Sequence, residues 1–319
     1  MQGGLVVHDE LVDGMIDEFP LLDSDHILHV PLASVQSITT PLRYPGGKSV
    51  LSKHVAHLIR ESGCSDTYVE PYAGGAGIAL RLLEAQQVSN ILINDRDPNV
   101  HAFWDAAVNR HADFMRLFDE VDPTLDQWKH WREVLRDPDD EVERGFAFFF
   151  LNRTSRSGVI NGGVIGGLGQ RGRYRVDARY NKDRLRMKLS FLGESADHIE
   201  VREDDGIEVV RNYARKDSTF LYADPPYVVK GASLYLNAFD KDQHRALADE
   251  LIQREYGTWM LTYDDAPLVR ELYGRMPGGL FSLRYSAANH RIAQETMIYS
   301  RGLLGSLPEI VRRELMEEE

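Results

Sequence analysis

The chain has 319 residues, of which 43% are hydrophobic, so it can bury a substantial core in one large domain or two ordinary ones. No run of 18 or more apolar residues occurs, and the sequence therefore predicts no membrane span. The single cysteine, Cys64, excludes an internal disulfide, and the eleven histidines show no metal-ligating spacing, so no metal site is predicted. The N-terminus lacks a signal-peptide pattern, and a cytoplasmic location is expected.

The charge of the chain is distributed unevenly. A formal net charge of -13 argues at first against a nucleic-acid partner. However, residues 1–40 contain seven acidic residues and no Lys or Arg, whereas residues 151–190 contain ten basic residues and two acidic ones. The overall acidity therefore does not exclude a basic nucleic-acid-binding face.

The order of the predicted elements indicates an interrupted α/β fold. The predicted strands cover residues 67–70, 90–94, 199–201, 220–223 and 259–262, and helices are expected over about 48–60, 77–83 and 240–254. Residues 100–151 have a helical pattern rich in aromatic residues, and the glycine-rich residues 155–175 are predicted to be loop or hairpin. The alternation predicts a mostly parallel sheet covered by helices, with a second, mainly helical subdomain inserted into it.

A glycine turn and a following acid indicate a nucleoside site. In YVEPYAGGAG (68–77) a strand ends in an acid and a turn of small residues opens a helix, so the backbone can approach a ligand closely. The spacing is not the dinucleotide fingerprint. Asp95 ends the next strand 20 residues after Gly75, where a carboxylate can accept both hydroxyls of a ribose. Asp97 is the better cap for the helix that starts near Pro98.

The sequence Asp224-Pro225-Pro226-Tyr227 directly follows an apolar strand. Two prolines end the strand and stiffen a loop at its carboxyl end, where open α/β sheets bind ligands. The Asp224 carboxylate and the Pro225 carbonyl could accept both hydrogens of an exocyclic amino group, which would turn the nitrogen lone pair toward a methyl donor. Tyr227 could stack on the base. A plain strand-terminating turn is the alternative interpretation.

Five segments, taken in this order, resemble the Dam-type adenine-N6-specific DNA methyltransferase family. They are PLRYPGGK (41–48), VEPYAGGAG (69–77), NDRD (94–97), FLNRTSRSG (150–158) and ADPPY (223–227), and LTYDD (261–265) and YSAANHRIAQETMIYS (285–300) resemble the family's final strands. The resemblance covers about residues 40–302. It implies a Rossmann-like S-adenosylmethionine-dependent methyltransferase sheet with an inserted, mainly helical DNA-recognition subdomain. It also implies methyl transfer to N6 of a flipped-out adenine in duplex DNA, without a metal because the sulfonium already activates the methyl group.

The resemblance also implies roles for individual residues. Tyr44 would pack on the cofactor, and Lys48 would contact the methionine end of the cofactor or the catalytic loop. Asp95 would hold the ribose, and Asp205 would approach the amino group of the cofactor's adenine. The methionine part would be lined by Glu70, Pro71, Gly74, Gly75 and Gly77, and the catalytic centre would be Asp224, Pro225, Pro226 and Tyr227.

The insertion would read double-stranded DNA. Arginine suits bidentate contact to guanine, and lysine or arginine suits phosphate. The expected DNA-binding residues are Arg153, Thr154, Arg156, Asn161, Arg171, Arg173, Arg179 and Lys182. The target adenine cannot be reached inside a duplex, so base flipping is expected.

The predicted domain organisation follows from the extent of the resemblance and the acidic ends of the chain. It comprises an acidic N-terminal extension (1–40), a catalytic methyltransferase domain (41–100 and 196–302), an inserted target-recognition domain (101–195) and an acidic C-terminal tail (303–319). Deletion of residues 1–40 is expected to spare catalysis. The enzyme is expected to be a monomer or weak dimer, and a cognate restriction endonuclease is considered as a partner.

Four other functions compete with this interpretation. An N4-cytosine DNA methyltransferase or an adenine-N6 ribosomal RNA methyltransferase would use the same chemistry at an exocyclic amine, although the large basic insertion favours duplex DNA. A catalytically silent DNA-binding protein is opposed by the intact Asp224–Tyr227 sequence. A nucleotide-dependent oxidoreductase is opposed by the spacing of the glycines.

Overall fold

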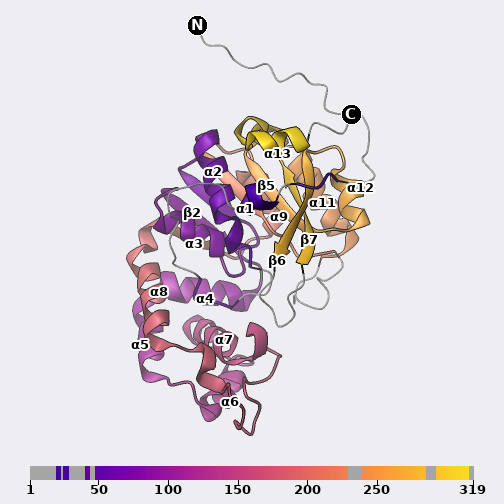
Figure 1. Ribbon diagram of the computed structural model, residues 1–319. Helices are drawn as coiled ribbons and strands as arrows, with labels where there is room; N and C mark the ends of the chain where they lie inside the picture. The colour runs from indigo at the N-terminus through magenta and orange to yellow at the C-terminus, as the bar shows by residue number, and fades with distance from the viewer. Residues whose placement is uncertain are drawn as a thin grey trace.

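The computed structural model describes residues 19–22, 24–28, 40–43, 47–228, 239–284 and 292–315. Its described residues form a seven-stranded sheet with helices on both faces and a helical part at one end (Figure 1). The strands are β1 (Thr67–Glu70), β2 (Asn90–Asn94), β3 (Ile199–Arg202), β4 (Thr219–Ala223), β5 (Trp259–Asp264), β6 (Gly278–Arg284) and β7 (Ile292–Tyr299). The predicted α/β fold class is confirmed, and each strand expected from the sequence is present within two residues of its predicted bounds.

The order in which the chain adds strands to the sheet reverses at its centre, between β1 and β4. The order is β3-β2-β1-β4-β5-β7-β6, in which β1 pairs in parallel with β2 on one side and with β4 on the other. Strand β7 is antiparallel to both β5 and β6. Open α/β sheets bind ligands at the carboxyl ends of the strands where the order reverses. Here these are the carboxyl ends of the neighbouring strands β1 and β4.

Helices cover the two faces of the sheet because alternate strand residues point to opposite sides. Tyr68 of β1 belongs to the buried cluster beneath α2 (Ser52–Ser62) and α3 (Gly77–Glu84). Its neighbour Val69 belongs to the cluster on the other face. The helices on that second face are α9 (Gly206–Tyr213), α11 (Lys241–Ile252) and α12 (Pro267–Tyr273). A 3-10 turn, η1 (Ser49–Leu51), leads into α2.

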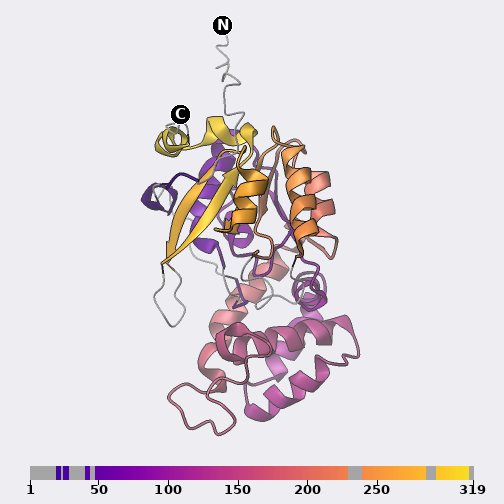
Figure 2. The same ribbon diagram turned by 90° about the vertical axis from the view of Figure 1, so that its right-hand side faces the viewer.

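The inserted part is a helical bundle, as the sequence predicts. It contains α4 (Pro98–Val108), α5 (His111–Glu120), α6 (Leu125–Val134), α7 (Glu141–Thr154) and α8 (Lys182–Glu194), with 3-10 turns η2 (Arg156–Gly158), η3 (Val176–Arg179) and η4 (Ala196–His198). Figure 2 shows these helices below the sheet. Helix α7 carries apolar side chains around most of its circumference because α4, α5 and α6 all pack against it.

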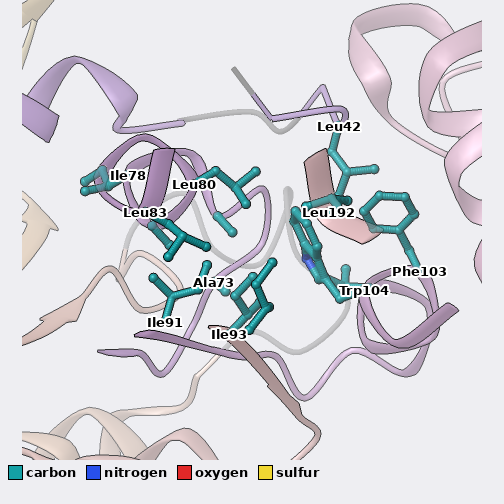
Figure 3. Packing of buried hydrophobic residues seen from close by; sticks show 14 of the residues in the cluster. Leu42, Ala73, Ile78, Leu80, Leu83, Ile91, Ile93, Phe103, Trp104 and Leu192 are labelled. Carbon is teal, nitrogen blue, oxygen red and sulfur yellow. The ribbon is translucent and has the colours of Figure 1, made fainter. Parts of the chain in front are cut away.

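Large apolar side chains join the insertion to the sheet (Figure 3). Trp104 and Phe103 of α4 pack beside Leu192 of α8 and Ile93 of β2 in one continuous buried cluster. The indole Nε1 of Trp104 also donates a hydrogen bond to the carbonyl of Gly74 at 2.9 Å. The first helix of the insertion therefore fixes the glycine turn that follows β1.

The structure changes the interpretation of both acidic ends of the chain. Within the predicted extension 1–40, Phe19 and Leu22 and also Ile27 of α1 (Ser24–Leu28) are buried. Within the predicted tail 303–319, Leu303 of η5 (Arg301–Ser306) and Val311 of α13 (Glu309–Glu314) are buried against the body of the protein. These buried apolar side chains make residues 19–22, 24–28 and 303–315 parts of the packed domain. Deletion of all of residues 1–40 would consequently remove core side chains.

A glycine allows α4 and α7 to cross at close range. A Cβ atom at Gly145 would lie 2.3 Å from the carbonyl oxygen of Ala102. We expect Gly145→Ala to destabilise the protein by about 1–3 kcal/mol because the two backbones must separate. Calorimetry should show a lower Tm. Gly305→Ala is the matched control, since its Cβ would meet nothing within 4 Å. Equal Tm values for the two variants would contradict the prediction.

Candidate active site

The predicted catalytic loop, residues 224–227, begins at the carboxyl end of β4. A residue of β5 holds the Asp224 carboxylate in place. The Oδ1 atom of Asp224 accepts a hydrogen bond from Thr262 Oγ1 at 2.8 Å. Because Thr262 gives its proton to Asp224, the Tyr222 hydroxyl, which lies 2.7 Å from Thr262 Oγ1, donates in turn. The Asp224 side chain remains 21% exposed. Burial raises the pKa of Asp224 to about 6, although Lys48 and Thr262 favour the ionised form.

The rest of the loop is rigid for reasons that the sequence indicated. Pro225 is buried and Pro226 is half-buried, so two residues with fixed φ angles turn the chain away from the sheet. Beyond them, the backbone N–H of Val228 donates to Asp264 Oδ1 at 2.9 Å. The loop is thus anchored to β5 before and after the prolines.

Lys48 lies against the catalytic loop, which is one of the two places expected for it. Its ammonium group contacts the Tyr227 hydroxyl and lies 3.0 Å from Glu295 Oε2 and 3.5 Å from Asp224 Oδ2. The Tyr227 hydroxyl donates to Glu295 Oε1 at 2.9 Å. Both Lys48 and Glu295 have side chains only 2% exposed. A buried cation is therefore shared between two carboxylates and a tyrosine.

Glu70 and the glycine turn lie at the end of β1, beside the loop from β4. Glu70 Oε1 accepts hydrogen bonds from the Tyr68 hydroxyl at 2.9 Å and from the Ala79 N–H at 3.1 Å. Burial raises the pKa of Glu70 to about 8. Gly74 has a φ of 46°, which a left-handed turn requires, and Pro71, Gly74 and Gly75 are buried. The turn packs tightly, because a Cβ on Gly77 would lie 3.1 Å from that of Ser49.

Two further predicted carboxylates lie at the ends of β2 and β3. Asp95 accepts hydrogen bonds from the Gly74 N–H at 2.8 Å and the Asp97 N–H at 2.9 Å, and burial raises its pKa to about 6. Asp97 caps α4, as the sequence predicts. Asp205 caps α9 and forms an exposed ion pair with Arg96 at 2.7 Å. Tyr44 lies outside the described residues.

Some of the predicted DNA-binding side chains are exposed, whereas others already contact residues of the protein itself. Arg156, Asn161, Arg171, Arg173 and Arg179 are exposed. One of the predicted contacts is corrected by the structure. Thr154 is fully buried, and its hydroxyl donates to the Phe150 carbonyl at 2.6 Å within α7, so it cannot reach DNA. Lys182 already pairs with Asp122 at 3.0 Å.

Arg153 belongs to a half-buried cluster of cations where residues 40–43 meet the insertion. Its Nη1 donates to the Pro41 carbonyl at 3.4 Å, and the Lys188 ammonium donates to the Thr40 carbonyl at 3.0 Å. Burial, and then the neighbouring Arg43, lower the pKa of Arg153 to about 10. Burial and Arg153 lower the pKa of Lys188 to about 8. Positive charge is thus concentrated at this junction.

The chain matches the D12 class N6 adenine-specific DNA methyltransferase family over residues 44–289. It belongs to this family. The methyltransferase is also similar to the Type II methyltransferase M.MjaIII of Methanocaldococcus jannaschii, with 26% identity over 207 residues that cover 58% of this chain and 68% of the relative. The predictions of DNA as substrate and adenine N6 as acceptor are confirmed, and the cytosine, RNA and oxidoreductase alternatives are disfavoured.

Methyltransferases of this class use S-adenosylmethionine, and the residues present fit that cofactor. Carboxylates suited to ribose hydroxyls and to an adenine amino group follow β2 and β3, next to the glycine turn of β1. Beside them, the buried Tyr72 hydroxyl has no hydrogen-bond partner within the described part of the chain. It lies close to Gly206, where a Cβ would be 2.2 Å from the Tyr72 ring. A buried donor left over beside Asp205 suits a purine with acceptor nitrogens.

Three groups in the methyltransferase site were not predicted. Thr262 and Glu295 lie in the two segments that resemble the family's last strands, and Tyr222 lies in the strand before the loop, but none of them received a role from the sequence. The signal for Glu295 is that it is the one charged residue of strand β7. Residues 285–291 of that segment lie outside the described residues.

In the described residues, no group of three or more His, Cys, Asp or Glu side chains has an arrangement that could hold a metal ion. Of the helices in those same residues, none is both long and apolar enough to cross a bilayer.

The raised pKa of Asp224 predicts an acid limit for catalysis. The ionised carboxylate is the form that accepts hydrogen bonds, so kcat/KM for DNA, which reports the enzyme before DNA binds, should fall as the pH drops through about 6 rather than through the ordinary range near 4. The measurement is kcat/KM for DNA against pH at saturating S-adenosylmethionine, so that titration of Asp95 on the cofactor side does not enter. Circular dichroism at each pH controls for unfolding. A kcat/KM that stays constant down to pH 5 would contradict the assignment.

Proposed function

We propose that the enzyme binds a flipped-out adenine of duplex DNA against the Asp224–Tyr227 loop and S-adenosylmethionine against the turn after β1. The observation that carries this proposal is the position of the Asp224 carboxylate. It lies at the reversal point between β1 and β4, with Oδ1 fixed by Thr262 at 2.8 Å and with part of the side chain exposed. The carboxylate is therefore pre-oriented and still accessible to an incoming base.

The proposed chemistry uses two acceptors on one amino group. The nitrogen of an aromatic amine is a weak nucleophile because its lone pair is delocalised into the ring. Hydrogen bonds to Asp224 and to the Pro225 carbonyl draw that lone pair out of conjugation and aim it at the methyl group. The negative charge of Asp224 also stabilises the positive charge that develops on the nitrogen. Tyr227 is proposed to stack on the base, with its hydroxyl held at the ring edge by Lys48 and Glu295.

The residues proposed to bind the cofactor lie at or just beyond the carboxyl ends of β1, β2 and β3. When bound, S-adenosylmethionine supplies an electrophilic methyl group on a sulfonium. Asp95 is proposed to hold the ribose, with both of its oxygens already oriented by backbone N–H groups. Glu70 and the glycine turn are proposed to line the methionine part. Asp205 is proposed to meet the adenine, in which case its contact with Arg96 is exchanged or shared.

The proposed catalytic role is tested by removing the carboxylate. Asp224→Ala should reduce methyl transfer by at least roughly 100-fold, because the amino group loses its charged acceptor. A radiolabelled methyl-transfer assay on a mixed DNA library gives the readout. Asp217→Ala is the matched control, since that exposed carboxylate precedes the opposite end of the same strand. Full activity of a folded Asp224→Ala variant would refute the mechanism.

We infer that DNA contacts the glycine-rich part of the insertion and the cation cluster beside it. Arg173 and Arg179 flank Tyr174, with guanidinium carbons 5.5 and 5.9 Å from its ring centroid, and Tyr174 is 56% exposed. The half-buried Arg153 and its neighbours repel one another, so a phosphate bound there would relieve that repulsion.

The DNA-binding face is tested by the salt dependence of affinity. Arg173→Gln combined with Arg179→Gln should weaken DNA binding, and each lost phosphate contact should lower the slope of log K against log salt by about 0.9. Fluorescence anisotropy at several salt concentrations provides the slope. Arg136→Gln is the control, because Arg136 is already held by both oxygens of Glu133, at 2.8 and 2.7 Å. Equal slopes for all three proteins would move the DNA site elsewhere.

The biological setting is proposed from the relative. Similarity to a Type II methyltransferase supports a place in a restriction–modification system, with a cognate restriction endonuclease as the partner. We further propose that the enzyme acts in the cytoplasm as a monomer or weak dimer, because its substrate is DNA and because one chain brings Asp224, Glu70 and Asp95 to the same edge of its sheet.

A further inference from the structure

Glu295 is a buried carboxylate that the proposed chemistry does not use. It lies on β7, where it pairs in register with Asp264 of β5 and with Phe281 of β6, and only 2% of its side chain is exposed. A buried ionised glutamate is costly unless it is paired, and apolar residues in its place are often as stable. Stability alone therefore does not account for a carboxylate at this position.

The hydrogen bonds around Glu295 have a defined direction. The Tyr227 hydroxyl has one proton, which it donates to Glu295 Oε1 at 2.9 Å, so its oxygen faces the Lys48 ammonium as an acceptor. The same ammonium lies 3.0 Å from Glu295 Oε2. Glu295 thus holds both Lys48 and Tyr227, and it fixes how the Tyr227 ring is presented.

The two carboxylates compete for one cation. Lys48 lies 3.0 Å from Glu295 and 3.5 Å from Asp224, so the closer contact is with Glu295. If Glu295 carried no charge, Asp224 would be the nearer anionic partner, and the ammonium would move toward it. A lysine in full contact with Asp224 would occupy the oxygen that is proposed to receive the adenine amino group.

We propose that Glu295 is a positioning residue for methyl transfer: it draws Lys48 away from Asp224 and anchors the Tyr227 hydroxyl, so that Asp224 keeps an oxygen available for the adenine. This inference rests on the proposed role of Asp224. Glu295 itself does not touch the substrate, and it acts through Lys48 and Tyr227.

Charge removal at Glu295 has a definite sign for the titration of Asp224. Among the described residues, the titratable groups around Asp224 are Lys48 before η1, Tyr68 and Glu70 on β1, Tyr222 on β4, Tyr227 in the loop, Tyr263 and Asp264 on β5, and Glu295 on β7. After burial, Lys48 lowers the pKa of Asp224 and Glu295 raises it. Neutralising Glu295 removes the raising charge and strengthens the lowering one, so the pKa of Asp224 should fall.

Glu295→Gln tests the proposal through two readouts. We expect kcat to fall by about 100-fold, because Lys48 then occupies part of the Asp224 carboxylate and because the Tyr227 hydroxyl loses its charged partner. We expect the acid limb of the profile of kcat/KM for DNA against pH to move to lower pH by about one pH unit. The cofactor Kd, measured by calorimetry without DNA, should change little. Glu200→Gln is the matched control, since Glu200 is an exposed carboxylate that pairs with Arg202 on the edge strand β3.

A folded Glu295→Gln variant with an unmoved acid limb would overturn the inference even if kcat were low, because a purely structural defect lowers kcat at every pH. An unchanged kcat would also overturn it. Should Glu295→Gln fail to fold, Lys48→Met provides the reciprocal test, and its acid limb must move to higher pH. Failure of the proposed function is distinguishable, because then Asp224→Ala itself would remain active.

Discussion

Parallel pairing of β1 with β4 is the constraint on which the rest of this methyltransferase depends. The two strands leave the centre of the sheet with their carboxyl ends side by side, and their connections continue to opposite sides. Glu70 with its glycine turn and Asp224 with its proline loop therefore lie at the same edge of the sheet, although 154 positions separate them in the chain. A nucleoside cofactor on one side and a base on the other are brought within reach by strand order alone.

Lys48, which directly precedes η1 and α2, connects this edge of the sheet to the segment before those helices. Its ammonium group reaches the loop after β4 and the strand β7 in the same contact, so it joins parts of the fold that are distant in sequence. Five positions earlier, the backbone of Arg43 exchanges hydrogen bonds with the side chain of Asn152 in α7, at 2.7 and 3.0 Å. Arg43 and Lys48, which are close in the sequence, thus contact the insertion that is proposed to bind DNA and the proposed catalytic loop, respectively.

The sequence predicted the sheet and the order of its motifs well, because buried parallel strands appear as short apolar runs that end in turn residues. It located Asp224, Asp95 and Asp97, whose positions depend on local strand ends. It did not reveal that Glu295 reaches Lys48, because that contact depends on the antiparallel return of β7 beside β5. It also treated Thr154 as exposed, since a threonine among arginines gives no sign that its helix is surrounded on all sides.

The distribution of charge was the least reliable guide to the structure of the two ends of the chain. A count of acidic residues does not reveal which of the neighbouring apolar side chains pack into the core. At the N-terminal side, Leu22 N–H donates to the Leu280 carbonyl at 2.7 Å, and Leu280 N–H donates to the Pro20 carbonyl at 2.6 Å. These bonds occupy both backbone groups of Leu280 on the outer edge of β6, the last strand of the sheet. An uncovered edge of this kind is a template on which strands of other molecules can add. Residues 20–22 therefore shield part of this edge, and a chain that lacks them would present the backbone groups of Leu280 to the strands of other molecules.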